Sequence, residues 1–345
     1  MRILHICLAS NYTEGMTYQD NLLPLQNALD GHDVCIIADC STYKDGKVVQ
    51  TEPCDYVLSS GIRLIRLPLI RLWPRFLTYK LRITPQLKKT INKFQPDVIL
   101  YHGLVGISLL TVGNYIHSNK NVKFYVDSHE DAHNSGLNWI SKWIQYKLIT
   151  RSILSLVRKK VDKVLYISIE TADFLKEHYK LQDDEMEFYP LGGYIIEPKQ
   201  KKSWRDDIRN YYALDKNNII LVHTGKLVSE KRTVELLRAF SKNTDPRLRL
   251  IIAGSIPENE EKNLLSLINN DNRIIYIGWV DGDTLTKLLC AADCYMQPGT
   301  QSATLQVALC CGLPIVVYPY TSHKPYIDDN GFFSSSEEEL SNIIN

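Results

Sequence analysis

The chain has 345 residues, of which 44% are apolar and 23% are charged, so its composition allows two globular domains of ordinary size and excludes wholesale disorder. The formal net charge is only +1, yet residues 61–160 contain 17 Lys and Arg against 4 Asp and Glu. This segment therefore carries +13 and the remainder about −12, which predicts an anionic partner for the N-terminal half.

In the N-terminal half, apolar runs typical of strands alternate with helical patterns, which favours a parallel sheet built from βαβ units. The predicted strands are 3–7, 34–38, 63–67, 98–101, 123–126 and 163–167. The predicted helices are 18–29, 85–94, 106–117, 139–159 and 171–178. The segment 189–194, which contains Pro190, Gly192 and Gly193, then interrupts the alternation and indicates a hinge.

A second alternating series follows this hinge. Its predicted strands are 219–223, 249–253, 273–277, 294–297 and 314–317, and its predicted helices are 234–241, 258–267, 283–291 and 302–311. We therefore predict an α/β chain of two Rossmann-like, doubly wound domains that face a cleft, the first at 1–195 and the second at 196–345. The alternative is a single large Rossmann enzyme, but no Gly-x-Gly-x-x-Gly follows any predicted strand.

Two loops in the second series have the chemistry of a phosphate site. Residues 225–232 and 296–306 each lie between a predicted strand and a predicted helix. Both contain glycine and hydroxyl side chains, and the first also contains two lysines. Free backbone N–H groups at such loops and helix N-termini bind anions. Two of these loops within one domain suggest a nucleotide diphosphate as the ligand.

With these loops placed, the chain resembles a GT-B glycosyltransferase of the large retaining family that uses nucleotide-sugar donors. The resemblance covers nearly the whole chain and is carried in the C-terminal half by Gly225-Lys226, Glu230-Lys231 and segments 252–255, 277–280 and 298–314. Segments 6–10 and 16–21 resemble bacterial members that build capsular and other surface polysaccharides. The resemblance implies retaining transfer of a hexose-type sugar from a UDP-sugar or GDP-sugar to a saccharide acceptor, with no cofactor besides this donor.

The resemblance also implies roles for individual residues of the donor domain. Lys226, where relatives usually have Arg, and Lys231 would grip the donor diphosphate beside Gly225. Cations at these positions would stabilise the charge that grows on the leaving nucleotide diphosphate as the glycosidic bond breaks. The alternative for Lys231 is an ion pair with Glu230 or another nearby acid on a solvated helix.

The donor loop departs from the family pattern. Relatives usually carry two Glu eight residues apart, but counting back from Gly312 puts Val307 and Gly299 in those places. Gln306 could still hold a ribose as a neutral amide. We expect Ser302, Ala303, Thr304 and Gly299 to approach the donor directly, or else Ser302 simply caps the following helix.

Two further expectations concern the same domain. Trp279 and Val280 follow a strand where relatives contact the base, although Trp279 could equally serve packing. No metal is expected, because no Asp-x-Asp stands at a strand end. The segment Asp281-Gly282-Asp283 has that spacing but reads as a turn leading into a helix.

In the N-terminal domain, a polar motif stands where the strand 123–126 ends. Its His129 matches a histidine that the family often places near the reacting sugar, and we assign it a positioning role among the catalytic residues. Asp127 belongs to the same acceptor side, unless it and Ser128 only cap the following helix. Ser10 and Asn11 follow the first strand and could meet the acceptor or form an ordinary turn. His5 and His223 lie within strands and are expected in the core.

Residues 63–93 contain many basic and aromatic residues and no acidic residue, and the first acid after them is Asp97. The predicted helix 139–159 contains further basic and aromatic residues. This combination fits the edge of an anionic bilayer, where a lipid-linked acceptor would lie. The alternatives are a solvated face over the sheet and a nucleic-acid surface.

Three features bear on where the protein is located. No signal peptide precedes the first strand, no apolar run reaches roughly 20 residues, and the eight cysteines indicate buried free thiols. We therefore expect a cytoplasmic protein at the inner face of the membrane.

Two other functions stay open. The missing Glu pair favours a catalytically silent GT-B subunit that binds a nucleotide sugar or a partner, whereas the retained lysines oppose it. A GT-B sugar-nucleotide epimerase would need no basic apolar face. The chain ends soon after 330–333, which leaves little for the C-terminal helix that relatives usually send back across the domains.

Overall fold

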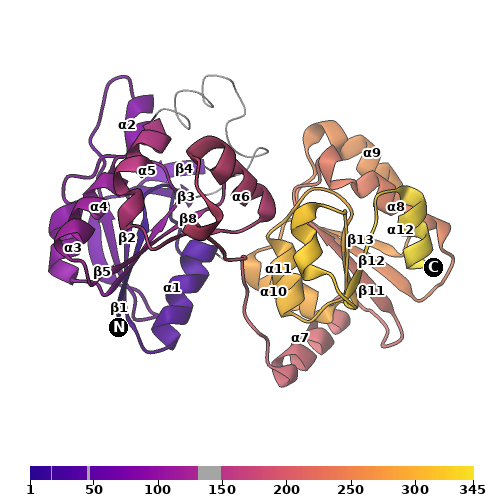
Figure 1. Ribbon diagram of the computed structural model, residues 1–345. Coiled ribbons are helices and arrows are strands. Elements are labelled where there is room, and N and C mark those ends of the chain that lie inside the picture. The colour runs from indigo at the N-terminus through magenta and orange to yellow at the C-terminus, as the bar shows by residue number, and fades with distance from the viewer. Residues whose placement is uncertain (17, 45–46, 131–148) are drawn as a thin grey trace. The chain divides into compact units, whose positions relative to one another are not determined.

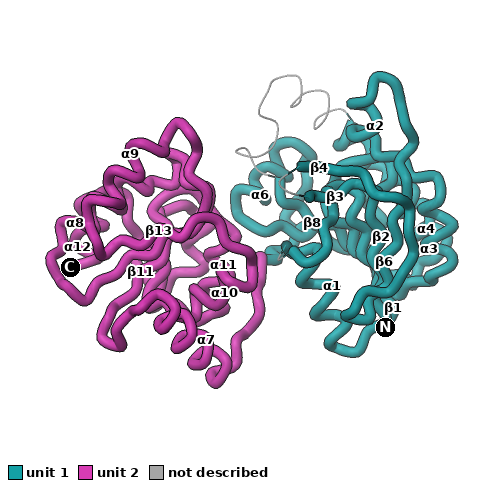
Figure 2. The backbone as a smooth tube through the Cα atoms, turned by 180° about the vertical axis from the view of Figure 1, so that it is seen from behind, with its two compact units in different colours: residues 1–190 teal, residues 191–345 magenta. Residues whose placement is uncertain are grey.

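The computed structural model describes residues 1–345 except 17, 45–46 and 131–148. It divides into two compact units, Met1–Pro190 and Leu191–Asn345, which Figure 2 shows in different colours. The division falls within the segment that the sequence marks as a hinge, slightly before the predicted boundary after residue 195. Each unit has its own sheet and its own core, so each is described by itself.

The first unit is built on one eight-stranded sheet. Its strands are β1 (Arg2–Cys7), β2 (Asp33–Asp39), β5 (Cys54–Val57), β6 (Arg63–Leu67), β7 (Val98–His102), β8 (Lys123–Ser128), β9 (Lys163–Tyr166) and β10 (Met186–Phe188). The order is β10-β9-β8-β7-β1-β2-β6-β5, and all neighbours pair in parallel except β5, which runs antiparallel to β6. A separate antiparallel pair is formed by β3 (Ser41–Lys44) and β4 (Lys47–Gln50).

Helices cover both faces of this sheet (Figure 1). They are α1 (Gln19–Leu29), α2 (Phe76–Leu81), α3 (Leu87–Phe94), α4 (Ser108–Ser118), α5 (Arg151–Val157) and α6 (Ile169–Phe174). Alternation along β1 explains the two faces, because successive side chains of a strand point to opposite sides. Leu4 and Ile6 pack in one core with α3, α4 and α5, whereas Cys7 packs in a second core beside Leu25 of α1.

The second unit has a six-stranded, all-parallel sheet. Its strands are β11 (Ile219–Thr224), β12 (Leu248–Ala253), β13 (Ile274–Gly278), β14 (Cys294–Gln297), β15 (Ile315–Val317) and β16 (Gly331–Phe333), in the order β13-β12-β11-β14-β15-β16. Its helices are α7 (Pro198–Tyr211), α8 (Thr233–Lys242), α9 (Glu258–Asn269), α10 (Gly282–Ala291), α11 (Thr304–Cys310) and α12 (Glu337–Ile344). Val222 packs with α10 and α11 on one face, and Leu221 packs with α8, α9 and α12 on the other.

The structure confirms the predicted α/β architecture of two doubly wound units and all eleven predicted strands. The sequence pattern did not predict the short strands β3, β4, β5, β10 and β16 or the helices α2, α7 and α12. The predicted helix 302–311 was too long at its start, since α11 begins at Thr304. The part of the predicted helix 139–159 up to residue 148 lies outside the described residues.

Two sequence expectations about the whole chain have structural counterparts. All eight cysteines are free thiols, and five of them are buried (Cys7, Cys35, Cys40, Cys290 and Cys311). None of the helices in the described ranges combines the length and the apolarity that a membrane crossing requires.

Candidate active site

Glycine turns follow three adjacent strands of the second unit at their carboxyl ends. Gly225 follows β11 with φ +130°, Gly254 follows β12 with φ +148°, and Gly278 ends β13 with φ +71°. A Cβ on Gly254 would stand 1.7 Å from the Gly225 carbonyl oxygen, so the two turns touch through bare backbone. Only glycine combines this φ with such a close approach. The Gly225 N–H donates to the Ala253 carbonyl and the Gly254 N–H to the Gly278 carbonyl, so the turns also hold one another through backbone hydrogen bonds.

Lys231 lies beside these turns and is almost fully buried. It ends the 3₁₀ turn Ser229–Lys231 before α8, and only 9% of the residue is exposed. Its Nζ donates to the carbonyl oxygens of Thr300 at 2.9 Å and Gln301 at 2.8 Å. Burial lowers the pKa of Lys231 to about 8. Lys231 therefore ties the two loops that the sequence analysis singled out, rather than pairing with Glu230.

Gly299 explains why those loops meet so closely. A Cβ at this position would stand 2.2 Å from the Glu230 carbonyl oxygen, and the same oxygen accepts the Thr300 N–H at 2.9 Å. Lys226, one residue after Gly225, is instead exposed on the first loop. The two lysines thus differ: one is fixed within the loop junction, and the other is free to follow a ligand.

Hydroxyl groups gather beneath the second loop. Ser302 Oγ accepts the Thr304 N–H at 3.3 Å, but the residue that caps α11 is Ala303, which has no side-chain hydrogen bond to the helix. Burial raises the pKa of Tyr295. The Tyr295 hydroxyl forms a hydrogen bond with the Thr224 hydroxyl at 3.1 Å and also faces Ser302 and Thr304. The exposed Ala303 lies between them at the tip. Tyr295 was not predicted, because it lies inside a strand that reads as core.

Trp279, Val280 and Gln306 separate into different environments. Trp279 directly follows Gly278 and is 73% exposed, so packing does not account for it. Val280 packs against the core beside α10 and α11. Gln306 lies on α11 with its side chain near the Tyr326 hydroxyl. Of these three residues, only Trp279 presents an exposed aromatic ring on which a ligand could stack.

The Asp281-Gly282-Asp283 segment is a helix start, as its sequence predicts. The side chain of Asp281 accepts the Thr284 N–H at 2.8 Å and caps α10. Asp283 pairs with Lys287 one turn later. Within the described ranges, no group of three His, Cys, Asp or Glu is arranged to hold a metal ion.

The first unit has a polar cluster at the carboxyl ends of β1, β7 and β8. Asp127 is fully buried and accepts the Gly103 N–H at 2.8 Å on one oxygen. Its other oxygen lies 2.6 Å from His102 Nδ1 and 3.8 Å from His129 Nε2. Burial alone would raise the pKa of Asp127, yet the charge and hydrogen bond of His102, with those of His129, hold it well below its usual range.

His129 itself stands at the edge of this cluster with 43% of its side chain exposed. Partial burial opposes its charged form, but the hydrogen bond and charge of Asp127 raise the pKa of His129. The next residue, Glu130, accepts the Tyr179 hydroxyl at 2.9 Å, and burial raises its pKa to about 7. The arrangement presents a hydrogen-bond-donating ring backed by a buried carboxylate.

Ser10 and Asn11 lie in the loop after β1 at the same edge of the sheet. Ser10 Oγ donates to Asp20 at 3.2 Å, and the Asn11 carbonyl accepts the Thr13 hydroxyl at 3.1 Å. A Cβ at Gly103 would stand 2.7 Å from the Ala9 Cβ, so the loops after β1 and β7 are in contact. The predicted acceptor-side residues therefore gather at one edge, together with Asp127 and His129.

Two residues of this cluster were missed or assigned another role. His102 ends β7 directly after the predicted strand 98–101, and the rule that polar residues at strand ends form sites would have found it. His5 was expected in the core and is indeed fully buried, but it bonds to His102 instead of apolar partners. His223 is also buried, held by Met296 O at 2.8 Å and Thr233 at 2.9 Å.

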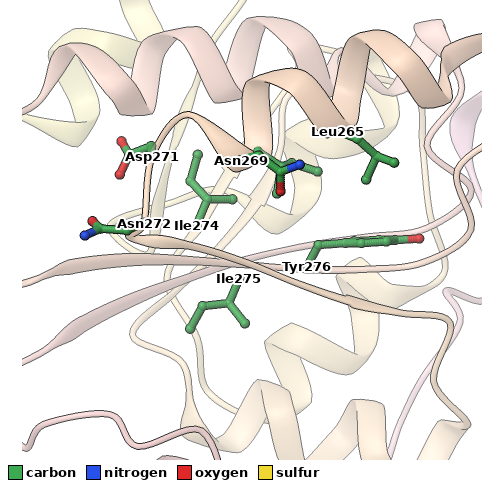
Figure 3. Close-up of a pocket in the computed structure, with 8 residues that line it drawn as sticks. Leu265, Asn269, Asp271, Asn272, Ile274, Ile275 and Tyr276 are labelled. Carbon is green, nitrogen blue, oxygen red and sulfur yellow. The ribbon is translucent and has the colours of Figure 1, made fainter.

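A separate hollow of about 440 Å³ lies at the opposite end of β13 (Figure 3). It is lined by the end of α9, by Asp271 and Asn272 in the following turn, and by Ile274, Ile275 and Tyr276. Because β13 ends at Gly278, this hollow opens toward the start of the strand and not toward the glycine turns. It contributes none of the predicted site residues.

Comparison with known proteins agrees with this geometry. Residues 24–192 match the model of Glycosyltransferase Family 4, and residues 204–345 match that of Glycosyl transferases group 1. Both units of the chain are therefore similar to glycosyltransferases. Its two units correspond to the two halves of the GT-B fold.

Individual relatives are distant. An uncharacterized glycosyltransferase of Methanocaldococcus jannaschii is 27% identical over 201 residues, which are 55% of this chain and 50% of that protein. The chain thus spans about half the length of the curated relatives it matches, or less. Two crystal structures share the fold. Anabaena HepE with UDP and glucose has a TM-score of 0.63 and 16% identity, over 100% of this chain and 89% of that one. WaaG, a glycosyltransferase involved in lipopolysaccharide biosynthesis, has a TM-score of 0.60 and 15% identity, over 99% of this chain and 89% of that one.

Proposed function

We propose that this protein is a group 1 glycosyltransferase that moves a hexose-type sugar, with retention, from a nucleoside diphosphate donor to a saccharide acceptor in surface polysaccharide synthesis. The donor would bind at the glycine turns of the second unit, and the acceptor would bind at the polar edge of the first. HepE, which has the same fold, was crystallised with UDP and glucose, and WaaG acts in lipopolysaccharide synthesis. These neighbours support the choice of donor and of pathway.

The observation that carries the proposal is the junction of Lys231 with the glycine turns. An ammonium group has three N–H donors, and Lys231 uses two of them on the carbonyls of Thr300 and Gln301. The third would meet a diphosphate oxygen that approaches the bare backbone of Gly225 and Gly254. Lys226 would supply a second, mobile cation, and both would stabilise the leaving diphosphate. Trp279, 73% exposed, would stack on the base.

A silent nucleotide-sugar-binding subunit is the second candidate, and one observation favours it. Gly299 stands where relatives usually have an acid, and its close contact with the Glu230 carbonyl leaves no room for any side chain. At the other acidic place, Val307 lies against Gly193. The contacts that relatives make to donor sugar and ribose through Glu would thus have to come from backbone and from Gln306.

Binding measurements test the donor site. We expect calorimetry with UDP, GDP and their sugars to find one nucleotide that binds the wild type, with affinity lost in the Lys226→Ala/Lys231→Ala double variant. Each charge-assisted hydrogen bond is worth roughly 1.5–3 kcal/mol, so the loss should be 100-fold or more. Lys216→Ala, an exposed lysine before β11, is the control and should bind normally. If no nucleotide binds the wild type, the donor assignment fails.

The acceptor would be lipid-linked and would lie at an anionic membrane surface. Around α2, large apolar side chains are exposed, namely Ile70 (38%), Trp73 (87%), Phe76 (60%) and Tyr79 (40%). The exposed Arg71 and Arg75 lie among them. Aromatic rings at the headgroup level together with basic residues favour peripheral binding, at about 1 kcal/mol for each cation. The basic and aromatic residues at 139–147 lie outside the described residues and do not enter this argument.

Vesicle sedimentation tests the membrane surface. We expect the wild type to bind vesicles that contain anionic lipid and to bind neutral vesicles weakly. Trp73→Ala/Phe76→Ala should weaken this binding about tenfold or more, since each ring contributes roughly 1–2 kcal/mol of burial. Val57→Ala, which removes an exposed apolar side chain from the edge strand β5, is the matched control. Equal binding to neutral and anionic vesicles would refute the electrostatic part of the proposal.

A further inference from the structure

A chain of hydrogen bonds crosses the carboxyl ends of β1, β7 and β8. It begins on α1 with Asn27 Oδ1, which lies 2.9 Å from His5 Nε2. His5 Nδ1 lies 3.0 Å from His102 Nε2, and the two rings stack with centroids 5.3 Å apart. His102 Nδ1 then lies 2.6 Å from Asp127 Oδ2. His5, His102 and Asp127 are all buried, so water does not compete for these bonds.

The chemistry of Asn27 fixes the direction of this chain. An amide oxygen only accepts, so His5 donates from Nε2 and must accept at Nδ1. This assignment agrees with a neutral His5, since burial and the neighbouring His102 lower its pKa to about 3. His102 consequently donates from Nε2 to His5 and from Nδ1 to Asp127.

His129 shares the carboxylate that this chain reaches. Its Nε2 lies 3.8 Å from Asp127 Oδ2, the same oxygen that accepts from His102. The other oxygen, Oδ1, is occupied by the Gly103 N–H at 2.8 Å. Two imidazole rings therefore draw on one negative charge, and groups that interact in this way titrate together.

We propose that Asp127 couples two imidazole rings, His102 in the core and His129 at the surface, and that the buried chain from Asn27 through His5 sets how much of the Asp127 charge reaches His129. Asn27, His5 and His102 are then positioning residues, which control whether His129 presents a charged or a neutral ring. Only one part of this inference rests on the proposed function, namely that the His129 ring contacts a hydroxyl of the donor sugar or of the acceptor.

Other titratable groups around the cluster are few among the described residues. Asp20 on α1 and Glu130 after β8 both favour the charged form of His129. Burial raises the pKa values of Cys7 at the end of β1 and Tyr189 after β10, and the negative charge of Asp127 raises them further. Both groups therefore stay neutral beside His129. None of these groups belongs to the hydrogen-bond chain itself. Variants of the chain therefore change the coupling and leave this background in place.

The test is the titration of the His129 ring, followed by nitrogen-15 NMR of ligand-free protein. Asp127→Asn should lower the His129 midpoint by about 1 pH unit or more, because the neighbouring negative charge is lost. His102→Phe should raise it by roughly half a unit to one unit, because His129 no longer shares the carboxylate. His117→Gln, an exposed histidine on α4, should change nothing and serves as control.

Asn27 provides the milder variants, since it lies half-exposed on α1 and its replacement leaves the core packing intact. Asn27→Leu removes the acceptor for His5 Nε2, so His5 changes tautomer and donates to His102. His102 then accepts at Nε2 instead of donating, so more of the Asp127 charge reaches His129 and the His129 midpoint should rise as in His102→Phe. Asn27→Gln keeps a neutral amide acceptor on the same face of α1 and should preserve the wild-type midpoint.

The outcomes separate cleanly. The proposal is overturned if the His129 midpoint is the same in the wild type, His102→Phe and Asn27→Leu, even where these variants lower the melting temperature. It is also overturned if Asn27→Gln behaves like Asn27→Leu. Because no donor or acceptor is present in the measurement, failure to find a transferase substrate would leave this result untouched, and the reverse holds as well.

Discussion

The two units form their polar sites by different means. In the second unit, the site is mostly backbone: Gly225 and Gly254 touch without side chains, and a single lysine joins the two loops. In the first unit, the site is made of side chains, with imidazoles around one buried carboxylate. Backbone suits a diphosphate, whose oxygens need several donors at short range. Side chains whose charge can change suit contacts with sugar hydroxyls, which both donate and accept.

The largest effect should come from filling the backbone site. Gly254→Ala places a Cβ 1.7 Å from the Gly225 carbonyl oxygen at a φ of +148°. We expect it to lower the free energy of unfolding by about 3 kcal/mol or more and to abolish nucleotide binding. Gly61→Ala also has positive φ but open space around it, and should cost only about 1 kcal/mol. Urea titration measures both; similar losses would mean that strain alone, and not the contact, matters.

The side-chain site should respond in rate and not in donor affinity. Asp127→Asn is expected to slow hydrolysis or transfer of the donor sugar roughly 10- to 100-fold, because His129 loses the charge that orients it. The UDP dissociation constant should stay unchanged, since Asp127 belongs to the other unit. Asp162→Asn, which replaces the acceptor of the Phe124 N–H at the start of β8, is the control. A parallel loss of UDP affinity would argue against this division of roles.

Acid–base behaviour should also differ between the sites. The pKa of Lys231 is lowered to about 8 by burial, so an increasing fraction is neutral above that pH. A bound diphosphate prefers the charged form, and UDP affinity should therefore fall about tenfold for each pH unit above 8 until the pKa of the complex is reached. Calorimetry between pH 7 and 9.5 measures this slope. Lys231→Ala should abolish it, and an unchanged slope in that variant would assign the effect to another group.

The smallest effect should come from the exposed ring. Trp279→Ala is expected to weaken UDP binding about fivefold, since stacking on a base contributes roughly 1–3 kcal/mol when the ring is well placed. Stability should stay the same, because 73% of Trp279 is exposed. Trp73→Ala, an exposed tryptophan of the first unit, should leave UDP binding unaltered. If the two variants bind UDP equally well, Trp279 has no role in base recognition.

The central strands could be predicted because both of their faces are buried. In β1 and β11, four of the six residues are apolar and nearly all are buried, which is typical of parallel strands between two layers of helices. The edge strands β5 and β16 leave most of their residues exposed and show no such run. The helix α7 fully buries only Arg209 and packs the core through Trp204 and Ile208 alone, so its otherwise polar sequence resembles a linker.

The candidate site was predictable where its residues follow one another in the chain. Gly225, Lys231 and Gly299 stand in two loops with recognisable strand–loop–helix patterns. His102 and Asp127 come together only because β7 lies between β8 and β1 in the sheet, and that order is a property of the fold. His5 looked like a core residue because strand periodicity records where a side chain points, and not what it meets there.

The different surroundings of Lys226 and Lys231 determine which substitutions each position tolerates. Lys226 is exposed, so the longer and wider side chain of an arginine fits there as well. Lys231 ends between two carbonyl oxygens in a space that holds a compact ammonium group. A planar guanidinium is too wide for that space and would push the loops apart. Natural variation should therefore alternate Lys and Arg at the first position and retain Lys at the second.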